Sequence, residues 1–256
     1  MQKRFTNKSS TMRFRMVGHG DLLPAKQAAS SSEGRPAMEG EVRFYLMGER
    51  AAVLASRAPA SLPCQRRIWW IADRLHGDAG LIDIVPGMNN LTLIFDPLSV
   101  DGKALLDRLR ALWLQAGQAE ETSREVSIPV SYGGTDGPDL GEVSHHTGLN
   151  EEEVIARHSG AEYVVYFLGF QPGFAYLGGL PESLVTPRRA EPRLAVPAGS
   201  VGIGGSQTGI YPTVTPGGWQ IIGRTEVPLF APSLCTPTLL LPGDRVQFIP
   251  VAADRA

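Results

Sequence analysis

Residues 163–180 read YVVYFLGFQPGFAYLGGL, and residues 186–225 read TPRRAEPRLAVPAGSVGIGGSQTGIYPTVTPGGWQIIGRT. The 55 positions from Gly169 to Gly223 include 12 glycines and 7 prolines, which is too many helix breakers for a helix. The segment is also too apolar and aromatic for a linker. Glycine admits positive φ and close backbone approach, whereas proline favours edges and turns. These residues therefore predict a compact β structure whose shaped turns carry binding groups.

Short runs with strand character lie within and after this segment. They are Tyr163–Phe167, Leu194–Val196, Trp219–Ile222, Thr238–Leu241 and Val246–Pro250. The last two should pair as a final hairpin, because Pro242-Gly243-Asp244 between them has strong turn chemistry. Many short strands of this kind favour a closed or nearly closed barrel.

Two short helices with recognisable capping residues precede the β-rich segment. The first should start at Asp139, with Glu142 as its capping partner, and end at Gly148. The second should start at Asn150 and run to about His158. Both are expected to be insertions in the barrel.

The preceding part of the chain alternates strands with two amphipathic helices. The expected strands are Val42–Met47, Ala51–Ala55, Leu81–Val85, Leu91–Phe95 and Glu125–Val130, and the expected helices are Cys64–His76 and Lys103–Gln115. This order predicts an N-terminal α+β domain over residues 39–124, with its helices on one face of a sheet, followed by a mostly-β barrel domain over residues 125–256.

The first 38 residues differ from the rest. Seven Lys or Arg residues precede Met38, against only Asp21 and Glu33, and no apolar stretch of signal-peptide kind is present. We interpret residues 1–38 as a disordered leader, with Met38 as an alternative start, and a targeting peptide as the other alternative.

Composition narrows the partners and the compartment. A formal charge of −2 gives no reason to expect nucleic acid or an anionic membrane as a partner. No apolar run approaches the ~18 residues that span a bilayer. Cys64 and Cys235 are far apart, and two isolated thiols suit a reducing cytoplasm better than a disulfide, which stays possible. A cytoplasmic protein is therefore expected.

The glycine-rich run from Gly199 to Gly209 invites comparison with nucleotide-binding loops, and it fits neither kind. It has no Gly-Lys-Ser/Thr, and Gln207 stands where a dinucleotide fingerprint needs its third glycine. The run does offer backbone N–H groups together with Ser200, Gln207 and Thr208, a set that suits a carboxylate, amide or urea-like group. The alternative is that these side chains satisfy their own turns.

Other chemistry-bearing residues give weaker signals. Arg188 and Arg224 lie in or beside the Gly/Pro loops, where guanidinium groups would match an anion, although each could also be a solvated charge. His145, His146 and His158 have no Cys or paired carboxylate at ligand spacing, so no metal is expected. His146 and His158 fit capping or core roles better. No Gly-x-Ser-x-Gly elbow occurs, and the catalytic residues are not identified.

Residues 132–225 resemble the PxpB/KipI family, also called allophanate hydrolase subunit 1, and the likeness extends over the chain apart from the leader. The segments that carry it include Tyr132-Gly-Gly134, His146-Thr-Gly148, Gly169-Phe-Gln-Pro-Gly-Phe-Ala-Tyr-Leu-Gly-Gly179, Val196-Pro-Ala-Gly-Ser-Val-Gly202, Gln207-Thr-Gly-Ile-Tyr-Pro212 and Pro216-Gly-Gly-Trp-Gln220. The resemblance implies a cyclophilin-like β-barrel behind a small α+β domain. The loop Pro86–Asn90 departs from the family pattern.

The same resemblance implies a non-autonomous enzyme subunit. The chain would open 5-oxoproline to glutamate together with a homologous PxpC/KipA-like subunit and a LamB/YcsF-type, PxpA-like subunit. ATP would be used by the complex and not held by a phosphate loop of this chain. Two alternatives stay open: an inhibitor of a sensor histidine kinase, and a carboxyltransferase component acting on urea or allophanate-like amides. The latter would need a biotin carrier elsewhere, since this chain has no Met-Lys-Met.

Under this interpretation the site residues fall into two groups. The candidates for substrate binding are Ser200, Gln207, Thr208, Tyr211, Arg224 and His158. The candidates for pocket walls or a subunit interface are Phe170, Pro172, Phe174, Tyr176, Arg188 and Trp219. These assignments are predictions from the resemblance and from residue type.

Overall fold

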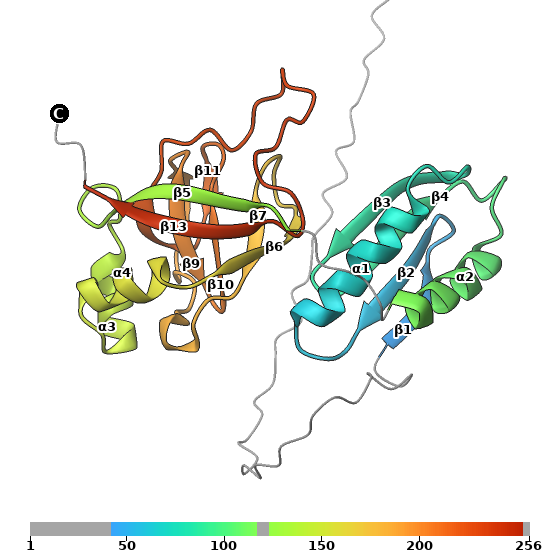
Figure 1. Cartoon of the computed structure of the whole chain (residues 1–256), viewed down its shortest axis with the longest axis horizontal. Helices are drawn as coiled ribbons and strands as arrows, with labels where there is room; N and C mark the ends of the chain where they lie inside the picture. Colours follow the sequence, from blue (N-terminus) through green and yellow to red (C-terminus); the bar gives the residue numbers. More distant parts are fainter. Residues whose placement is uncertain (1–41, 117–122, 253–256) are drawn as a thin grey trace, which may run out of the picture. The chain divides into compact units, whose positions relative to one another are not determined.

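A computed structural model describes residues 42–116 and 123–252 (Figure 1). Its elements form a four-stranded sheet with two helices, a closed barrel of seven strands and a two-stranded ribbon. The leader predicted over residues 1–38 lies outside the described residues. Within the described ranges, no helix has the length and apolar character needed to cross a membrane.

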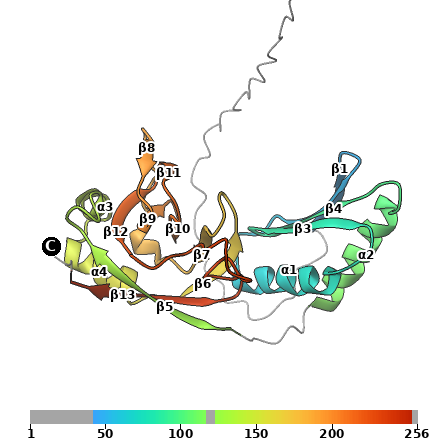
Figure 2. The same ribbon diagram turned by 90° about the horizontal axis from the view of Figure 1, so that it is seen from above.

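The four-stranded sheet is antiparallel throughout and has the order β1-β2-β4-β3. Its strands are β1 (Val42–Met47), β2 (Ala51–Ser56), β3 (Leu81–Gly87) and β4 (Asn90–Phe95), and its helices are α1 (Leu62–Leu75) and α2 (Gly102–Gln115). Both helices lie on the same face of the sheet (Figure 2). Alternate residues such as Leu54, Leu91 and Leu93 point to that face and are fully buried against Ile68 and Leu109.

The seven-stranded barrel is closed, as the sequence predicted. Its strand order is β10-β7-β6-β13-β5-β12-β9. The bounds are β5 (Glu125–Tyr132), β6 (Tyr163–Leu168), β7 (Ala175–Gly178), β9 (Ser200–Gly204), β10 (Gln207–Ile210), β12 (Gln220–Arg224) and β13 (Arg245–Val251). A ribbon of β8 (Arg193–Val196) and β11 (Thr215–Gly217) and the 3₁₀ turn Glu182–Leu184 complete this part. The barrel interior is filled by apolar side chains including Ile128, Val165, Ile203 and Phe248.

The expected final hairpin is wrong. Thr238 makes only an isolated bridge with Phe230, whereas the last strand, β13, pairs in parallel with β5 and antiparallel with β6. Barrel closure explains the difference, because the C-terminal strand satisfies its backbone groups against the first barrel strand rather than against its neighbour in sequence. Figure 1 shows β5 and β13 running side by side.

The expected glycine-rich loop is also different in the structure. Residues 200–210 form the hairpin β9–β10, with Gln207 opposite Gly204 and Ile210 opposite Val201. Most of its backbone amides therefore belong to strand ladders and are not free to cradle a ligand.

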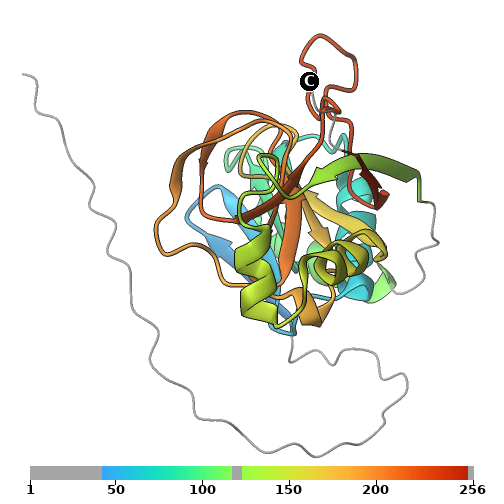
Figure 3. The same ribbon diagram turned by 90° about the vertical axis from the view of Figure 1, so that its left-hand side faces the viewer.

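The two short helices lie together beside the barrel (Figure 3). They are α3 (Leu140–Thr147) and α4 (Glu151–Ser159). The expected cap of α4 is confirmed, since Asn150 Oδ1 accepts from the Glu153 amide at 2.8 Å and Glu153 Oε2 accepts from the Asn150 amide at 2.9 Å. The expected Asp139–Glu142 capping pair is wrong: Asp139 stands at the N-cap of α3, but its side chain makes no cap hydrogen bond.

Helix α1 contacts barrel strand β6 through side-chain donors. Trp69 Nε1 donates to the Tyr166 carbonyl at 2.7 Å, and Gln65 Nε2 donates to the same carbonyl at 3.1 Å. Gln65 is fully buried, and its oxygen accepts from the Asn89 amide at 3.2 Å. These bonds satisfy a polar side chain that would otherwise be costly to bury.

Candidate functional site

An aromatic cluster lies beside the barrel and is separate from the barrel's interior core. It consists of Phe174, Tyr211 and Trp219, with Tyr176 packed against it. The rings meet edge to face, with centroids 5.4 Å apart for Phe174–Tyr211 and 5.5 Å apart for Phe174–Trp219. This geometry is the favourable one for aromatic pairs. Four of the twelve predicted site residues are thus brought together.

The glycines of the β9–β10 hairpin make room for this cluster. A Cβ at Gly204 would lie 2.3 Å from Trp219 Nε1, and one at Gly209 would lie 2.9 Å from the Ala175 carbonyl oxygen and 3.2 Å from the Trp219 ring. Trp219 therefore packs directly on strand backbone. These glycines were expected to form a ligand-binding loop. In the structure they allow an aromatic ring to pack directly on the strand backbone.

Replacing Gly204 by alanine is expected to destabilise the protein by about 1–3 kcal/mol, because the new methyl group overlaps the buried indole and forces it to move. Urea unfolding would measure the loss. Gly141→Ala is the matched control: the nearest atom to its Cβ is the Glu151 carboxylate at 3.4 Å, and alanine favours helix α3. The interpretation of Gly204 is wrong if both variants have the same stability.

Phe170 stands at the edge of the cluster in an unusual conformation. Its φ is +65°, and its side chain is 60% exposed. The ring meets Phe174 edge to face at 5.4 Å. A non-glycine residue in this region carries strain, and such strain is common at functional sites. Pro172 in the same loop is also exposed.

A cavity of about 630 Å³ lies beside the cluster, and Arg188 borders both. The guanidinium carbon of Arg188 lies 5.9 Å from the centre of the Trp219 ring. Gln220 and Asp139 also line the cavity. The cavity is open and lined mainly by charged and polar residues, and Arg188 connects it to the aromatic cluster, so it could receive a small polar molecule.

Asp139 accepts several hydrogen bonds at the edge of this cavity. Its carboxylate accepts from Arg189 at 2.9 Å, from Arg193 at 2.7 and 2.8 Å, and from the Ile221 amide at 2.7 Å. The Asp139 side chain is only 5% exposed. Its hydrogen bonds raise the pKa of Arg193. The carboxylate therefore ties β8, β12 and the start of α3 together.

The sequence did not predict the ion pairs of Asp139 with Arg189 and Arg193. Asp139 was interpreted as a helix cap, and Arg189 and Arg193 were not among the candidate site residues. One signal was present: three arginines lie within residues 188–193, and any of them that is withdrawn from solvent needs an anionic partner. The sequence could not say which carboxylate provides it.

His158 and Thr208 lie inside the barrel, away from the aromatic cluster. His158 is fully buried, with Nδ1 2.8 Å from the Tyr132 hydroxyl and Nε2 3.0 Å from Thr208 Oγ1. Thr208 Oγ1 donates to the Gly202 carbonyl at 2.9 Å, so it must accept from Nε2–H. Tyr132 then donates to Nδ1, and the imidazole is neutral. Burial lowers the pKa of His158 to about 3 and raises that of Tyr132.

The other predicted binding residues lie elsewhere on the barrel. Ser200 is buried and stands opposite Arg224 on the neighbouring strand. Arg224 forms an ion pair with Glu226 at 3.2 Å. Gln207 is half-buried at the turn of the β9–β10 hairpin. Burial raises the pKa of Tyr211, so its hydroxyl stays neutral.

Histidine side chains are not gathered at one place. His145 and His146 are exposed on α3, whereas His158 is buried in the barrel. Among the residues that the structure describes, no group of three His, Cys, Asp or Glu side chains could hold a metal ion.

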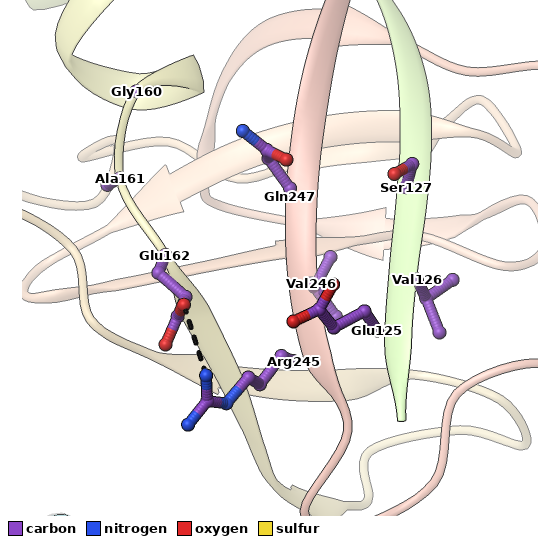
Figure 4. A pocket seen from close by; sticks show the side chains of 9 residues that line it. All are labelled: Glu125, Val126, Ser127, Gly160, Ala161, Glu162, Arg245, Val246 and Gln247. Atoms are coloured by element: carbon purple, nitrogen blue, oxygen red, sulfur yellow. Dashed lines mark ion pairs between the residues drawn. The ribbon is translucent and has the colours of Figure 1, made fainter. Parts of the chain in front are cut away.

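A second cavity, of about 280 Å³, lies over β5 and β13 (Figure 4). Arg245 and Glu162, 3.6 Å apart, line one end of it, and Gln247 lies toward the other. Its polar side chains are mostly exposed, and none of the predicted site residues lines it. The cavity beside Arg188 is therefore the better candidate.

Most of the chain matches a known protein family. Residues 42–240 match the carboxyltransferase domain, subdomains C and D. The crystal structure of TTHA0988 superposes with a TM-score of 0.70 and 40% sequence identity, over 79% of this chain and 40% of that longer chain.

Two relatives are closer to this chain in length. The chain is 54% identical to the 5-oxoprolinase B subunit of Escherichia coli O157:H7, over 81% of this chain and 95% of that protein. It is 49% identical to the 5-oxoprolinase B subunit of Haemophilus influenzae, over 79% of this chain and 95% of that protein. The chain belongs to the family of 5-oxoprolinase B subunits.

Proposed function

We propose that this chain is a subunit of an ATP-dependent 5-oxoprolinase and opens 5-oxoproline to glutamate together with partner subunits. The observation that carries the proposal is 54% identity over 95% of the length of the Escherichia coli relative.

The partners are a homologous PxpC/KipA-like subunit and a LamB/YcsF-type, PxpA-like subunit, and the complex acts in the cytoplasm. Residues 39–124 form a separate α+β domain, and residues 125–256 form a cyclophilin-like barrel domain.

The chemistry explains why partner subunits are needed. A five-membered lactam is a stable amide, and ATP would supply activation of its carbonyl for attack by water. The β9–β10 hairpin does not fit a phosphate-binding loop, because its residues pair with β7, β9, β10 and β12 along strand ladders and it has no lysine. ATP would therefore be used by the complex and not be bound by a phosphate loop of this chain.

This chain would contribute binding groups and shape. Arg188 lies beside the aromatic cluster, lines the cavity and is placed to contact substrate, while the exposed Phe170 and Pro172 fit a subunit interface. His158 and Thr208 stabilise the interior of the barrel through their hydrogen bonds. Phe174, Tyr176, Tyr211 and Trp219 form the aromatic cluster beside the cavity. Ser200, Gln207 and Arg224 stay candidates for contacts at the margin of the site.

Reconstitution tests the division of labour. The purified chain alone is expected to release no glutamate from 5-oxoproline and ATP, and the mixture with both partner subunits is expected to release it. A coupled glutamate assay, with gel filtration to detect the complex, gives the measurement. Glutamate formation by the isolated chain, or none by the complete mixture, would refute the proposal.

A further inference from the structure

We propose that the cavity beside Arg188 binds the carboxylate and the ring N–H of a lactam amino acid, with Arg188 and Gln220 as the recognising side chains. This inference rests on the proposed function and specifies which part of the chain receives the substrate. Two observations support it: Arg188 has no carboxylate partner among the described residues, and the buried Gln220 Oε1 has no hydrogen-bond donor. The arrangement of polar groups on the ligand is the third argument.

Arg188 is the cation of this cavity that is left for a ligand. Asp139 forms ion pairs with the neighbouring Arg189 at 2.9 Å and with Arg193 at 2.7 Å. In residues 42–116 and 123–252, no carboxylate forms an ion pair with Arg188, whose side chain is exposed above the Trp219 ring. The face of the indole attracts the guanidinium group and keeps it at the cavity, where its N–H fork can bind a carboxylate in bidentate fashion.

Gln220 supplies the unusual acceptor. The residue is 6% exposed and lines the cavity. Its Nε2 donates to the Pro187 carbonyl at 3.1 Å, which fixes the orientation of the amide. Its Oε1 is buried and has no hydrogen-bond partner in the described part of the chain. A buried acceptor without a donor is costly, so a ligand that brings an N–H group relieves that cost.

A lactam amino acid carries the two matching groups side by side. In 5-oxoproline the ring N–H and the carboxylate are attached to the same carbon atom, so one molecule can offer a donor to Gln220 and an anion to Arg188. The exposed Glu142 and Glu191 also line the cavity. They would repel the several negative charges of a nucleotide phosphate more strongly than a single carboxylate. The cavity therefore favours the lactam substrate over ATP.

The test uses the complex reconstituted with its partner subunits. Arg188→Met is expected to raise the KM for 5-oxoproline at least about 10-fold with little change in kcat, because a charged hydrogen bond made in the ground state is lost. Inhibition by 2-pyrrolidinone, which has the lactam but no carboxylate, should be the same in the variant and the unmodified complex. N-methyl-5-oxoproline, which lacks the N–H donor, should bind to the unmodified complex at least about 10-fold more weakly than 5-oxoproline.

Arg43→Met is the matched control, since Arg43 is exposed on β1 and does not line the cavity. It should leave the KM unchanged. If the unmodified complex hydrolyses 5-oxoproline and Arg188→Met leaves its KM unchanged, or weakens 2-pyrrolidinone equally, the inference is wrong and the proposed function stands. Equal binding of the N-methyl compound would also overturn it. If the unmodified complex is inactive, the proposed function fails and the inference fails with it.

Discussion

Replacing Asp139 by alanine is expected to lower the free energy of unfolding by about 3–5 kcal/mol, because two arginines then lose their shared buried anion. The carboxylate receives hydrogen bonds from Arg189, Arg193 and the Ile221 amide, all between 2.7 and 2.9 Å. Its side chain is 5% exposed, so solvent screens these contacts little. Chemical denaturation at neutral pH measures the effect.

Two further variants define what Asp139 does. Glu142→Ala removes an exposed carboxylate from the first turn of the same helix and should change stability by about 0.5 kcal/mol or less. Arg193→Met should cost less than Asp139→Ala, because Asp139 keeps Arg189 and the Ile221 amide as partners. A loss from Asp139→Ala as small as that from Glu142→Ala would show that the cluster contributes nothing to the fold.

Acidification is expected to destabilise the protein through His158. Its pKa is about 3 in the folded state and 6.5 in the unfolded chain, so between these values the unfolded state binds the proton more readily. The stabilisation from neutral His158 is complete above pH 6.5 and is lost as the pH falls toward 3, at about 1.4 kcal/mol per pH unit. From pH 7 to pH 5 this single group should remove about 2 kcal/mol.

Comparison with a variant isolates this contribution from that of the carboxylates. His158→Phe should be less stable at pH 7, because the Tyr132 and Thr208 hydroxyls lose their partner, but its stability should fall by about 2 kcal/mol less between pH 7 and pH 5. Tyr132 and Tyr163 beside the imidazole do not titrate in acid, since burial raises the pKa of both. Parallel pH curves for the His158 variant and the unmodified protein would contradict this account.

Local patterns in the sequence predicted the elements that local interactions stabilise. The two amphipathic helices and the strands of the four-stranded sheet occur within two residues of the expected bounds, and the Asn150 capping box forms as expected. The closed barrel was also predicted, from the number of short strands between Gly and Pro turns. The helices, the strands and the capping box depend on neighbours a few residues apart, whereas the strand pairs that close the barrel do not.

The candidate site was predicted only in part. The aromatic residues and Arg188 do come together, whereas Thr208 and His158 lie inside the barrel with their hydrogen bonds satisfied. Thr208 was expected from residue type to be a polar contact for a ligand, whereas His158 was expected to fit a core role better and was a binding candidate only as an alternative. A hydroxyl or an imidazole looks the same in sequence whether it faces a cavity or a buried partner, so only burial distinguishes the two.

The amino-acid sequence was sufficient for the periodic helices, the turns and the family to which the chain belongs, because these depend on residue types at fixed short spacing. Tertiary structure alone showed that β13 closes the barrel against β5 and that Trp219 packs on the backbone at Gly204 and Gly209. It also showed that Asp139 binds two arginines 50 and 54 positions away. The physical reason is that strand pairing, close packing and charge neutralisation depend on distances in space. The spacing of residues along the chain does not determine those distances.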